Sequence, residues 1–140
     1  MTIAEAEQQL IEEFSYFTEW MDKYAYIIEL GKELPMIDPQ FKTPHHLITG
    51  CQSQVWLHAD FIDGIIIFTA DSDAIITKGI VNLLIKVLSN RTPQEILEAK
   101  LDFIDAIGLR VHLSPTRSNG LNSMLKQMKL YANAFQMKQK

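Results

Sequence analysis

The sequence predicts an α+β fold: a small antiparallel β-sheet, formed by a hairpin over about residues 54–70, packed by helices. Two observations predict this class. Apolar and polar residues alternate on both sides of the turn pair Asp63-Gly64, and segments with helical spacing of apolar residues precede and follow that stretch. A chain of 140 residues has the length of one domain, so we expect a single domain over 1–140.

The first element is predicted to be one long helix from about Ile3 to Leu30. Apolar residues recur there at steps of three or four, which places them on one face of a helix. They are Leu10, Phe14, Phe17, Met21, Tyr24 and Ile28. Gly31 and Pro35 are expected to end the helix, and Leu34 to Pro44, with three prolines, to form an irregular loop.

The hairpin is predicted from a change of periodicity between Gln54 and Phe61, where apolar residues recur at every second position. The inward face is expected to carry Val55, Leu57, Ala59 and Phe61. Asp63-Gly64 is a strong signal for a two-residue turn, because both positions need a left-handed backbone. The β-branched run from Ile65 to Thr69 then forms the returning strand.

A buried helix is expected next, capped by Asp71, Ser72 or Asp73 and running to about Ser89. Apolar residues cover most of its circumference and leave one narrow polar stripe. That stripe consists of Lys78, Asn82 and Lys86. We expect this helix to lie across the hairpin.

Three further helices are predicted toward the C-terminus. Thr92-Pro93-Gln94-Glu95 has the pattern of a capping box with proline at the first helical position, so a short helix begins there. Another short helix is expected from Asp102 to Ile107, ending at Gly108. The last helix is predicted from Ser118 to Met137. Its expected inner face carries Leu121, Leu125, Met128 and Phe135.

Charge and hydropathy exclude several classes of partner. The net charge of -4 argues against nucleic acid, whose phosphates need clustered Lys and Arg. Apolar runs fall short of the ~20 residues that span a membrane, and the N-terminus lacks a basic start followed by an apolar stretch. The single cysteine cannot close an internal disulfide and fits a reducing compartment. We therefore expect a cytoplasmic monomer without a membrane partner.

The only cysteine, Cys51, lies in the run Gly50-Cys51-Gln52-Ser53-Gln54, where a loop enters the first strand. A thiolate is the strongest side-chain nucleophile near neutral pH, but a lone cysteine is more often a small buried apolar residue. Gly50 permits close backbone approach, and the three polar residues that follow are unusual for a core position. These neighbours weaken the interpretation of a buried apolar thiol without displacing it, so from the residues alone both interpretations stay open.

Positive side chains near Cys51 would lower the pKa of its thiol. His45 and His46 precede it in sequence, whereas His112 and Arg117 can reach it only through the fold. A Cys–His hydrolase also needs a group that orients the histidine, and the sequence shows none. A structural zinc site takes four ligands, which one cysteine and two adjacent histidines do not supply. We expect no bound metal and no cofactor.

Four motifs in order along the chain resemble the SufE family of sulfur acceptors. They are Leu30-Gly31-Lys32-Glu33-Leu34-Pro35, Gly50-Cys51-Gln52-Ser53-Gln54-Val55-Trp56, Asp71-Ser72-Asp73-Ala74 with Lys78-Gly79, and Leu113-Ser114-Pro115-Thr116-Arg117-Ser118. The resemblance spans Trp20 to Leu121. It implies an α+β fold similar to that of the iron–sulfur scaffold proteins, and an accessory role in sulfur transfer rather than an enzyme.

The resemblance also implies partners and roles. A cysteine desulfurase, which itself carries pyridoxal phosphate, would hand its persulfide sulfur to Cys51 and be stimulated by losing it. The chain would then deliver the sulfur to an iron–sulfur scaffold or another acceptor. Arg117 falls at the family's arginine and would stabilise the thiolate or persulfide, while Gly50, Gln52, Ser53 and Gln54 would support the loop. The alternative is a module that binds a metal or cluster through Cys51 and a histidine.

Overall fold

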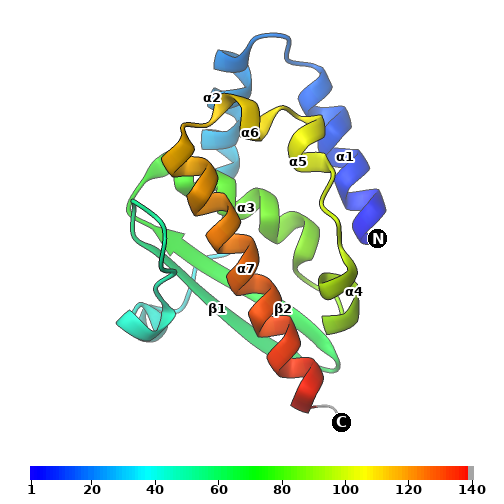
Figure 1. Ribbon diagram of the computed structural model, residues 1–140, viewed down its shortest axis with the longest axis vertical. Coiled ribbons are helices and arrows are strands. Elements are labelled where there is room, and N and C mark those ends of the chain that lie inside the picture. Colours follow the sequence, from blue (N-terminus) through cyan, green and yellow to red (C-terminus); the bar gives the residue numbers. More distant parts are fainter. Residues whose placement is uncertain (139–140) are drawn as a thin grey trace.

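The computed structural model describes residues 1–138 and folds them into a two-stranded antiparallel sheet packed by helices (Figure 1). Strands β1 (Val55–Ile62) and β2 (Ile65–Ser72) pair along their whole length. The turn between them has Asp63 at φ 52° and Gly64 at φ 81°, the left-handed pair that a two-residue hairpin needs. The predicted α+β class and the hairpin are confirmed.

One face of the hairpin forms the core. Val55, Leu57 and Ala59 are buried there, as the alternation predicted. Helix α3 (Ile75–Leu88) packs against β2, and α7 (Pro115–Lys138) runs along the hairpin, in front of it in the view of Figure 1. Tyr131 of α7 donates its hydroxyl to the Leu57 carbonyl at 3.2 Å. Both helices therefore share the covering of the sheet.

The predicted long N-terminal helix is wrong, because the chain forms two helices, α1 (Ile3–Ser15) and α2 (Trp20–Gly31). A straight helix of that length would extend about 40 Å, beyond the core that it has to cover. The turn between the helices instead brings Phe14 and Phe17 onto Tyr26, at 5.2 and 5.1 Å between ring centroids. The apolar register also changes: Met21, expected inside, is 74% exposed.

The predicted cap of α3 is wrong as well. The N-cap residue is Ala74, whose side chain makes no capping bond, because Asp71, Ser72 and Asp73 bind other parts of the chain. The expected polar stripe is also interrupted. Asn82 is buried and donates its side-chain amide to the Leu30 carbonyl at 2.6 Å, beside the bond that this carbonyl accepts from the Glu33 amide at the end of α2.

Helices α2 and α3 cross at two glycines, Gly31 and Gly79. A Cβ on Gly79 would collide with the backbone carbonyl of Ile27, and one on Gly31 would lie 2.8 Å from the Gly79 amide nitrogen. Side chains at this crossing would force the helices apart. The glycines thereby set the position of the N-terminal half of α3, which faces the loop that contains Cys51.

The C-terminal helices follow the prediction in part. Helix α4 (Pro93–Glu98) has both halves of the Thr92 capping box, and α5 (Phe103–Ala106) is followed by Gly108 at φ 79°. The short helix α6 (Leu109–His112) was not predicted. Helix α7 begins at Pro115, three residues before the predicted start, because proline is well suited to the first turn of a helix.

Two short 3-10 helices, η1 (Pro39–Phe41) and η2 (Pro44–His46), interrupt the predicted irregular loop. This segment lies on the other face of the hairpin. The Lys42 ammonium stands 4.6 Å from the Trp56 ring centroid, and Phe41 stacks on His58 with the ring centroids 3.8 Å apart. The segment therefore covers part of the sheet face that the large helices leave open.

Candidate functional site

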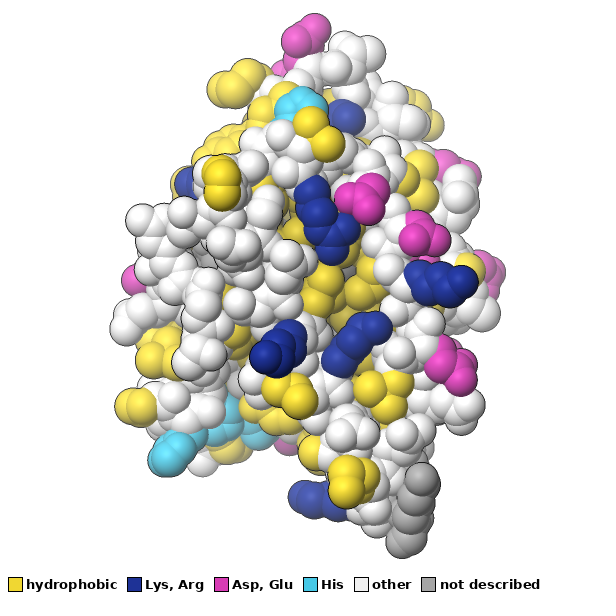
Figure 2. All heavy atoms as spheres, viewed as in Figure 1, with side chains coloured by type: hydrophobic (Ala, Val, Ile, Leu, Met, Phe, Trp, Pro, Cys, Tyr) yellow, Lys and Arg dark blue, Asp and Glu magenta, His cyan; other side chains and the backbone are white. Residues whose placement is uncertain are grey.

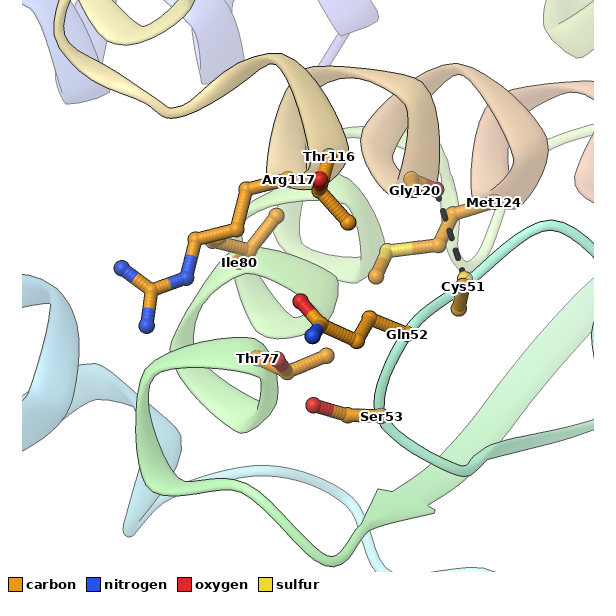
Figure 3. Close-up of a pocket in the computed structure, with 9 residues that line it drawn as sticks. All are labelled: Cys51, Gln52, Ser53, Thr77, Ile80, Thr116, Arg117, Gly120 and Met124. Atoms are coloured by element: carbon orange, nitrogen blue, oxygen red, sulfur yellow. Dashed lines mark hydrogen bonds between the residues drawn. The ribbon is translucent and has the colours of Figure 1, made fainter.

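Cys51 lies in the loop that leads into β1, between the first turns of α7 and the N-terminal half of α3 (Figure 3). Its side chain is partly buried and borders a cavity of about 70 Å³. The lining residues are Cys51, Gln52, Ser53, Thr77, Ile80, Thr116, Arg117, Gly120 and Met124. One water-sized group needs roughly 10–15 Å³ by this measure, so the cavity has room for an added atom beside the sulfur.

The thiol of Cys51 donates a hydrogen bond to the Gly120 carbonyl, with 3.6 Å between Sγ and the oxygen (Figure 3). A carbonyl oxygen can only accept, so it favours the protonated thiol over the thiolate. Gly120 also lets the loop approach α7, because a Cβ on it would stand 3.6 Å from Sγ. In the folded protein, α7 thus holds the thiol in its neutral form.

Burial raises the pKa of the Cys51 thiol above its ordinary value. Since the thiolate is the nucleophile, a raised pKa lowers reactivity at neutral pH. The sulfur is therefore less reactive while it lies inside, and exposing the loop would remove both the burial and the Gly120 hydrogen bond.

Hydrogen bonds fix both ends of the Cys51 loop. On the near side the Ile48 amide donates to the Val55 carbonyl at 2.9 Å. On the far side the Gln54 carbonyl accepts from the Ser72 hydroxyl at 2.7 Å, and the Gln54 amide donates to Asp73 Oδ1 at 3.0 Å. The predicted caps of α3 thus anchor the loop. The stretch of residues 49–53, which contains Cys51, lies between the two anchors.

Gly50, predicted to support the loop, has φ 91°, a left-handed conformation that favours glycine. A Cβ at this position would collide with Ser123 Oγ on α7. Gln52 and Ser53 line the cavity, whereas Gln54 is exposed and binds the loop anchor through its backbone. Gln52 and Ser53 therefore lie at the cavity, Gly50 lies against α7, and Gln54 serves as the loop anchor.

Arg117 lines the same cavity from the first turn of α7, and its guanidinium extends away from Cys51 (Figure 3). The guanidinium carbon lies 6.0 Å from the ring centroid of Tyr24 on α2. Within the described residues, Asp71 pairs with Lys42 and Lys78 instead of with Arg117. Arg117 is thus exposed at the cavity rim. Among residues 1–138 it has no carboxylate partner.

The histidines near Cys51 in sequence are not gathered around its thiol. His46 Nε2 lies 3.2 Å from His58 Nδ1, and His112 stacks on Trp20 at 4.5 Å between ring centroids. Burial, followed by the neighbouring His58 and His45, lowers the pKa of His46. Among residues 1–138, no three His, Cys, Asp or Glu side chains come together as a metal site. No histidine is among the residues that line the cavity beside Cys51.

Five of the residues that line the cavity were not predicted as site residues from the sequence. Thr116, Gly120 and Met124 follow each other at steps of four on α7, so they share a stripe that faces the loop. Thr77 and Ile80 face it from α3. A glycine inside a helix costs up to about 1 kcal/mol relative to alanine, so Gly120 was a detectable signal of close approach.

Comparisons with known proteins agree on one family. The model of the SufE family, described as an Fe-S metabolism associated domain, matches residues 8–132. An uncharacterised SufE-like protein of Rhizobium meliloti is 41% identical over 126 residues, which cover 86% of this chain and 90% of that protein. A SufE-like protein of Synechocystis is 40% identical over 131 residues, covering 94% and 82% respectively.

Two further matches bear on length and fold. The SufE-like protein 1, chloroplastic/mitochondrial, of Arabidopsis thaliana is 41% identical over 132 residues, and the match covers 94% of this chain and 36% of that one. The solution structure of a hypothetical protein from Thermus thermophilus superposes with a TM-score of 0.76 at 21% identity, covering 92% and 94% of the two chains. The latter likeness shows a shared fold.

Proposed function

The chain belongs to the SufE family, and from that premise we propose that it accepts persulfide sulfur on Cys51 from a cysteine desulfurase and delivers it for iron–sulfur cluster assembly. The family match supports an accessory role in iron–sulfur metabolism. The carrier role rests on the site: a single thiol, partly buried, beside a cavity with room for one more sulfur atom.

The proposed transfer is a thiol–persulfide exchange. The Cys51 thiolate attacks the outer sulfur of the desulfurase persulfide, and a new S–S bond forms at Cys51. The S–S bond of the desulfurase breaks, and its cysteine leaves as a thiolate that takes up a proton. No net oxidant is needed, since the sulfur arrives already at the persulfide level.

We expect the reaction to require movement of the loop, because in the resting state the Cys51 sulfur is partly buried and hydrogen-bonded to the Gly120 carbonyl. The anchors at Ile48 and Gln54 confine the motion to the stretch between them. Once outside, the thiol loses the burial that raises its pKa. Docking of the desulfurase would therefore also activate the thiol, because it draws the loop out of its buried position.

Arg117 is proposed to stabilise the exposed thiolate and the persulfide that follows. Its guanidinium lies at the rim of the cavity, over Tyr24. A change of rotamer would bring the positive charge next to Cys51 as its loop moves out of the cavity. A cation beside a thiolate favours the charged form. In the resting state the guanidinium points away, which agrees with a thiol whose pKa is raised rather than lowered.

After the exchange, the loop returns and places the outer sulfur in the cavity. A persulfide exposed to solvent would lose its sulfur to any small thiol, since thiol exchange depends on access. The cavity walls of Gly120 and Met124 are buried and would exclude such thiols. The same loop movement then presents the sulfur to the downstream scaffold.

The chain is proposed to act as a monomeric accessory protein without a cofactor of its own; pyridoxal phosphate belongs to the desulfurase. The cytoplasm is the proposed compartment, on the ground that one unpaired thiol persists in a reducing environment. Within the described part of the chain, no helix is long and apolar enough to cross a membrane.

The experiment that tests this function measures the turnover of the desulfurase from the same organism with and without the chain. We expect the parent chain to raise sulfide release in the presence of a reductant and Cys51→Ser to give none of that increase. Binding of both chains to the desulfurase, followed by calorimetry, separates loss of chemistry from loss of docking. Equal stimulation by Cys51→Ser would overturn the proposal.

A further inference from the structure

A second cluster lies on the face of the hairpin opposite the core, away from Cys51, and contains two imidazoles in contact. His46 ends η2 and His58 lies in β1; their Nε2 and Nδ1 atoms are 3.2 Å apart. Figure 2 shows histidine side chains at the surface at lower left, over the segment that Figure 1 draws in cyan. His46 and His58 are both partly buried, the His58 side chain being 16% exposed, so both rings keep some contact with solvent.

The outer nitrogen of each ring is held by an oxygen. His58 Nε2 lies 3.0 Å from Asp60 Oδ1, and His46 Nδ1 lies 3.0 Å from Thr43 Oγ1. Phe41 stacks on His58 with an interplanar angle of 8° and fixes the plane of that ring. Metal-binding histidines are oriented in this way, with the outer nitrogen bonded to a carboxylate or another oxygen acceptor.

The spacing of the inner nitrogens also fits a metal. Two imidazole nitrogens bound to one tetrahedral Zn²⁺, each at about 2.0–2.1 Å, lie about 3.4 Å apart. The observed 3.2 Å between Nε2 of His46 and Nδ1 of His58 is close to that value. The two nitrogens are hydrogen-bonded to each other, so a shared ion would replace this contact after a small rotation of the rings.

We propose that His46 and His58 bind one divalent transition-metal ion of the Zn²⁺ class, with Asp60 and Thr43 orienting the two rings. Water would fill the remaining coordination positions. Imidazole suits Zn²⁺, Cu²⁺ and Ni²⁺, whereas Mg²⁺ and Ca²⁺ prefer oxygen ligands. The bound ion would link η2 to β1, a few residues before the Cys51 loop.

The protons balance without a further reactant. In the neutral, metal-free pair one arrangement satisfies every contact: His46 Nε2 donates to His58 Nδ1, His58 Nε2 donates to Asp60, and the Thr43 hydroxyl donates to His46 Nδ1. When the metal takes both inner nitrogens, the His46 proton moves to Nδ1, and the Thr43 oxygen becomes its acceptor. Binding to the neutral pair therefore releases no proton.

The test is calorimetric titration of Zn²⁺ near neutral pH into the Cys51→Ser chain, so that the thiol cannot contribute. We expect one ion per chain. His46→Gln and His58→Gln should each weaken binding at least tenfold, and Asp60→Ala about tenfold through loss of ring orientation. His112→Gln, which removes a histidine stacked on Trp20, is the matched control and should change the dissociation constant less than twofold.

Nuclear magnetic resonance of the imidazole nitrogens keeps the proposal testable if a variant fails to fold. In the parent chain, Zn²⁺ should shift His46 Nε2 and His58 Nδ1 and leave both nitrogens of His112 unchanged. Absence of saturable binding would overturn the site. So would binding that survives His58→Gln and is lost in His45→Gln, because the ion would then sit on the adjacent pair of η2.

Discussion

The Sγ atom of Cys51 donates a hydrogen bond across 3.6 Å to the backbone carbonyl of Gly120, so the reactive loop is held by the first turns of α7. This contact keeps the thiol protonated and places it against a helix position that has no side chain. It connects two properties that a carrier cysteine needs, namely protection at rest and release on docking. Both properties can be tested through this contact and its surroundings.

Gly120→Leu should push Cys51 out of its site. The new Cβ would stand 3.6 Å from Sγ, and the atoms beyond it would overlap the thiol. We expect alkylation of Cys51 by iodoacetamide to become at least about tenfold faster, with a stability loss of about 1–3 kcal/mol from overpacking. Gly120→Ala is the control: its Cβ makes only an ordinary contact and should leave alkylation near the parental rate. Unchanged alkylation in the leucine variant would contradict the packing described.

The pKa of Cys51 predicts a pH dependence of stability. Burial raises the pKa in the folded state, so as pH rises the unfolded state loses its proton first, near its ordinary value of about 8.5. The folded state then binds more protons than the unfolded state, and stability falls with rising pH. Urea unfolding at several values from about pH 7 to about pH 10 should show a steeper decline for the parent than for Cys51→Ser. Parallel curves would argue against a buried neutral thiol.

Ser72→Ala should loosen the loop at its far anchor. The hydroxyl of Ser72 donates to the Gln54 carbonyl at 2.7 Å and accepts from the Ala74 amide at 3.3 Å. We expect a loss of about 1–2 kcal/mol in stability and faster alkylation of Cys51.

The matched control for that variant is Ser89→Ala. It removes the hydroxyl that accepts from the Phe68 amide at 2.9 Å, far along the hairpin from the loop. Stability should fall by a similar amount while the alkylation rate stays parental. If both variants expose the thiol equally, global unfolding rather than loop release governs access to Cys51.

Arg117→Ala should leave the fold intact and slow sulfur acceptance about tenfold, equivalent to ~1.4 kcal/mol in the barrier. The side chain is exposed and lies over the Tyr24 ring at 6.0 Å, so little stability depends on it. The measurement is a single-turnover transfer from the persulfidated desulfurase. Arg110→Ala removes an arginine bonded to Asp105 and should transfer at the parental rate. Equal rates for the two variants would remove Arg117 from the mechanism.

The sequence was sufficient for elements whose signal is local. The turn at Asp63-Gly64 follows from two left-handed positions, and the start of α4 from the paired capping bonds of Thr92 and Glu95. The inward face of β1 follows from strict alternation. In each case the residues that decide the structure are neighbours in the chain, so no knowledge of tertiary packing is needed.

Where tertiary contacts decide, the sequence was insufficient. The break between α1 and α2 depends on Phe14 and Phe17 meeting Tyr26 after the chain turns back, which a helical period does not reveal. Ser72 and Asp73 have the residue types of a helix cap, but they bind Gln54, nearly twenty residues earlier. The helix-capping propensity of Ser72 and Asp73 did not decide the structure, because both side chains bind the Gln54 backbone instead of the first turn of α3.

The candidate site also contains residues that the sequence predicts and contacts that only the fold creates. Cys51 and its loop neighbours were identifiable because the motif is contiguous, and Arg117 through a second motif. The hydrogen bond from Cys51 to the Gly120 carbonyl could not be predicted from the sequence, since every residue has a backbone carbonyl. Only the fold brings the Gly120 carbonyl to the thiol and shows that the arginine points away from the sulfur at rest.

The most direct measurement is mass spectrometry of the chain after incubation with the desulfurase, pyridoxal phosphate and cysteine. The account predicts one added sulfur on the peptide that contains Cys51, removable by a reductant, and none on the Cys51→Ser chain. An unmodified Cys51 beside a desulfurase that still carries its own persulfide would contradict it.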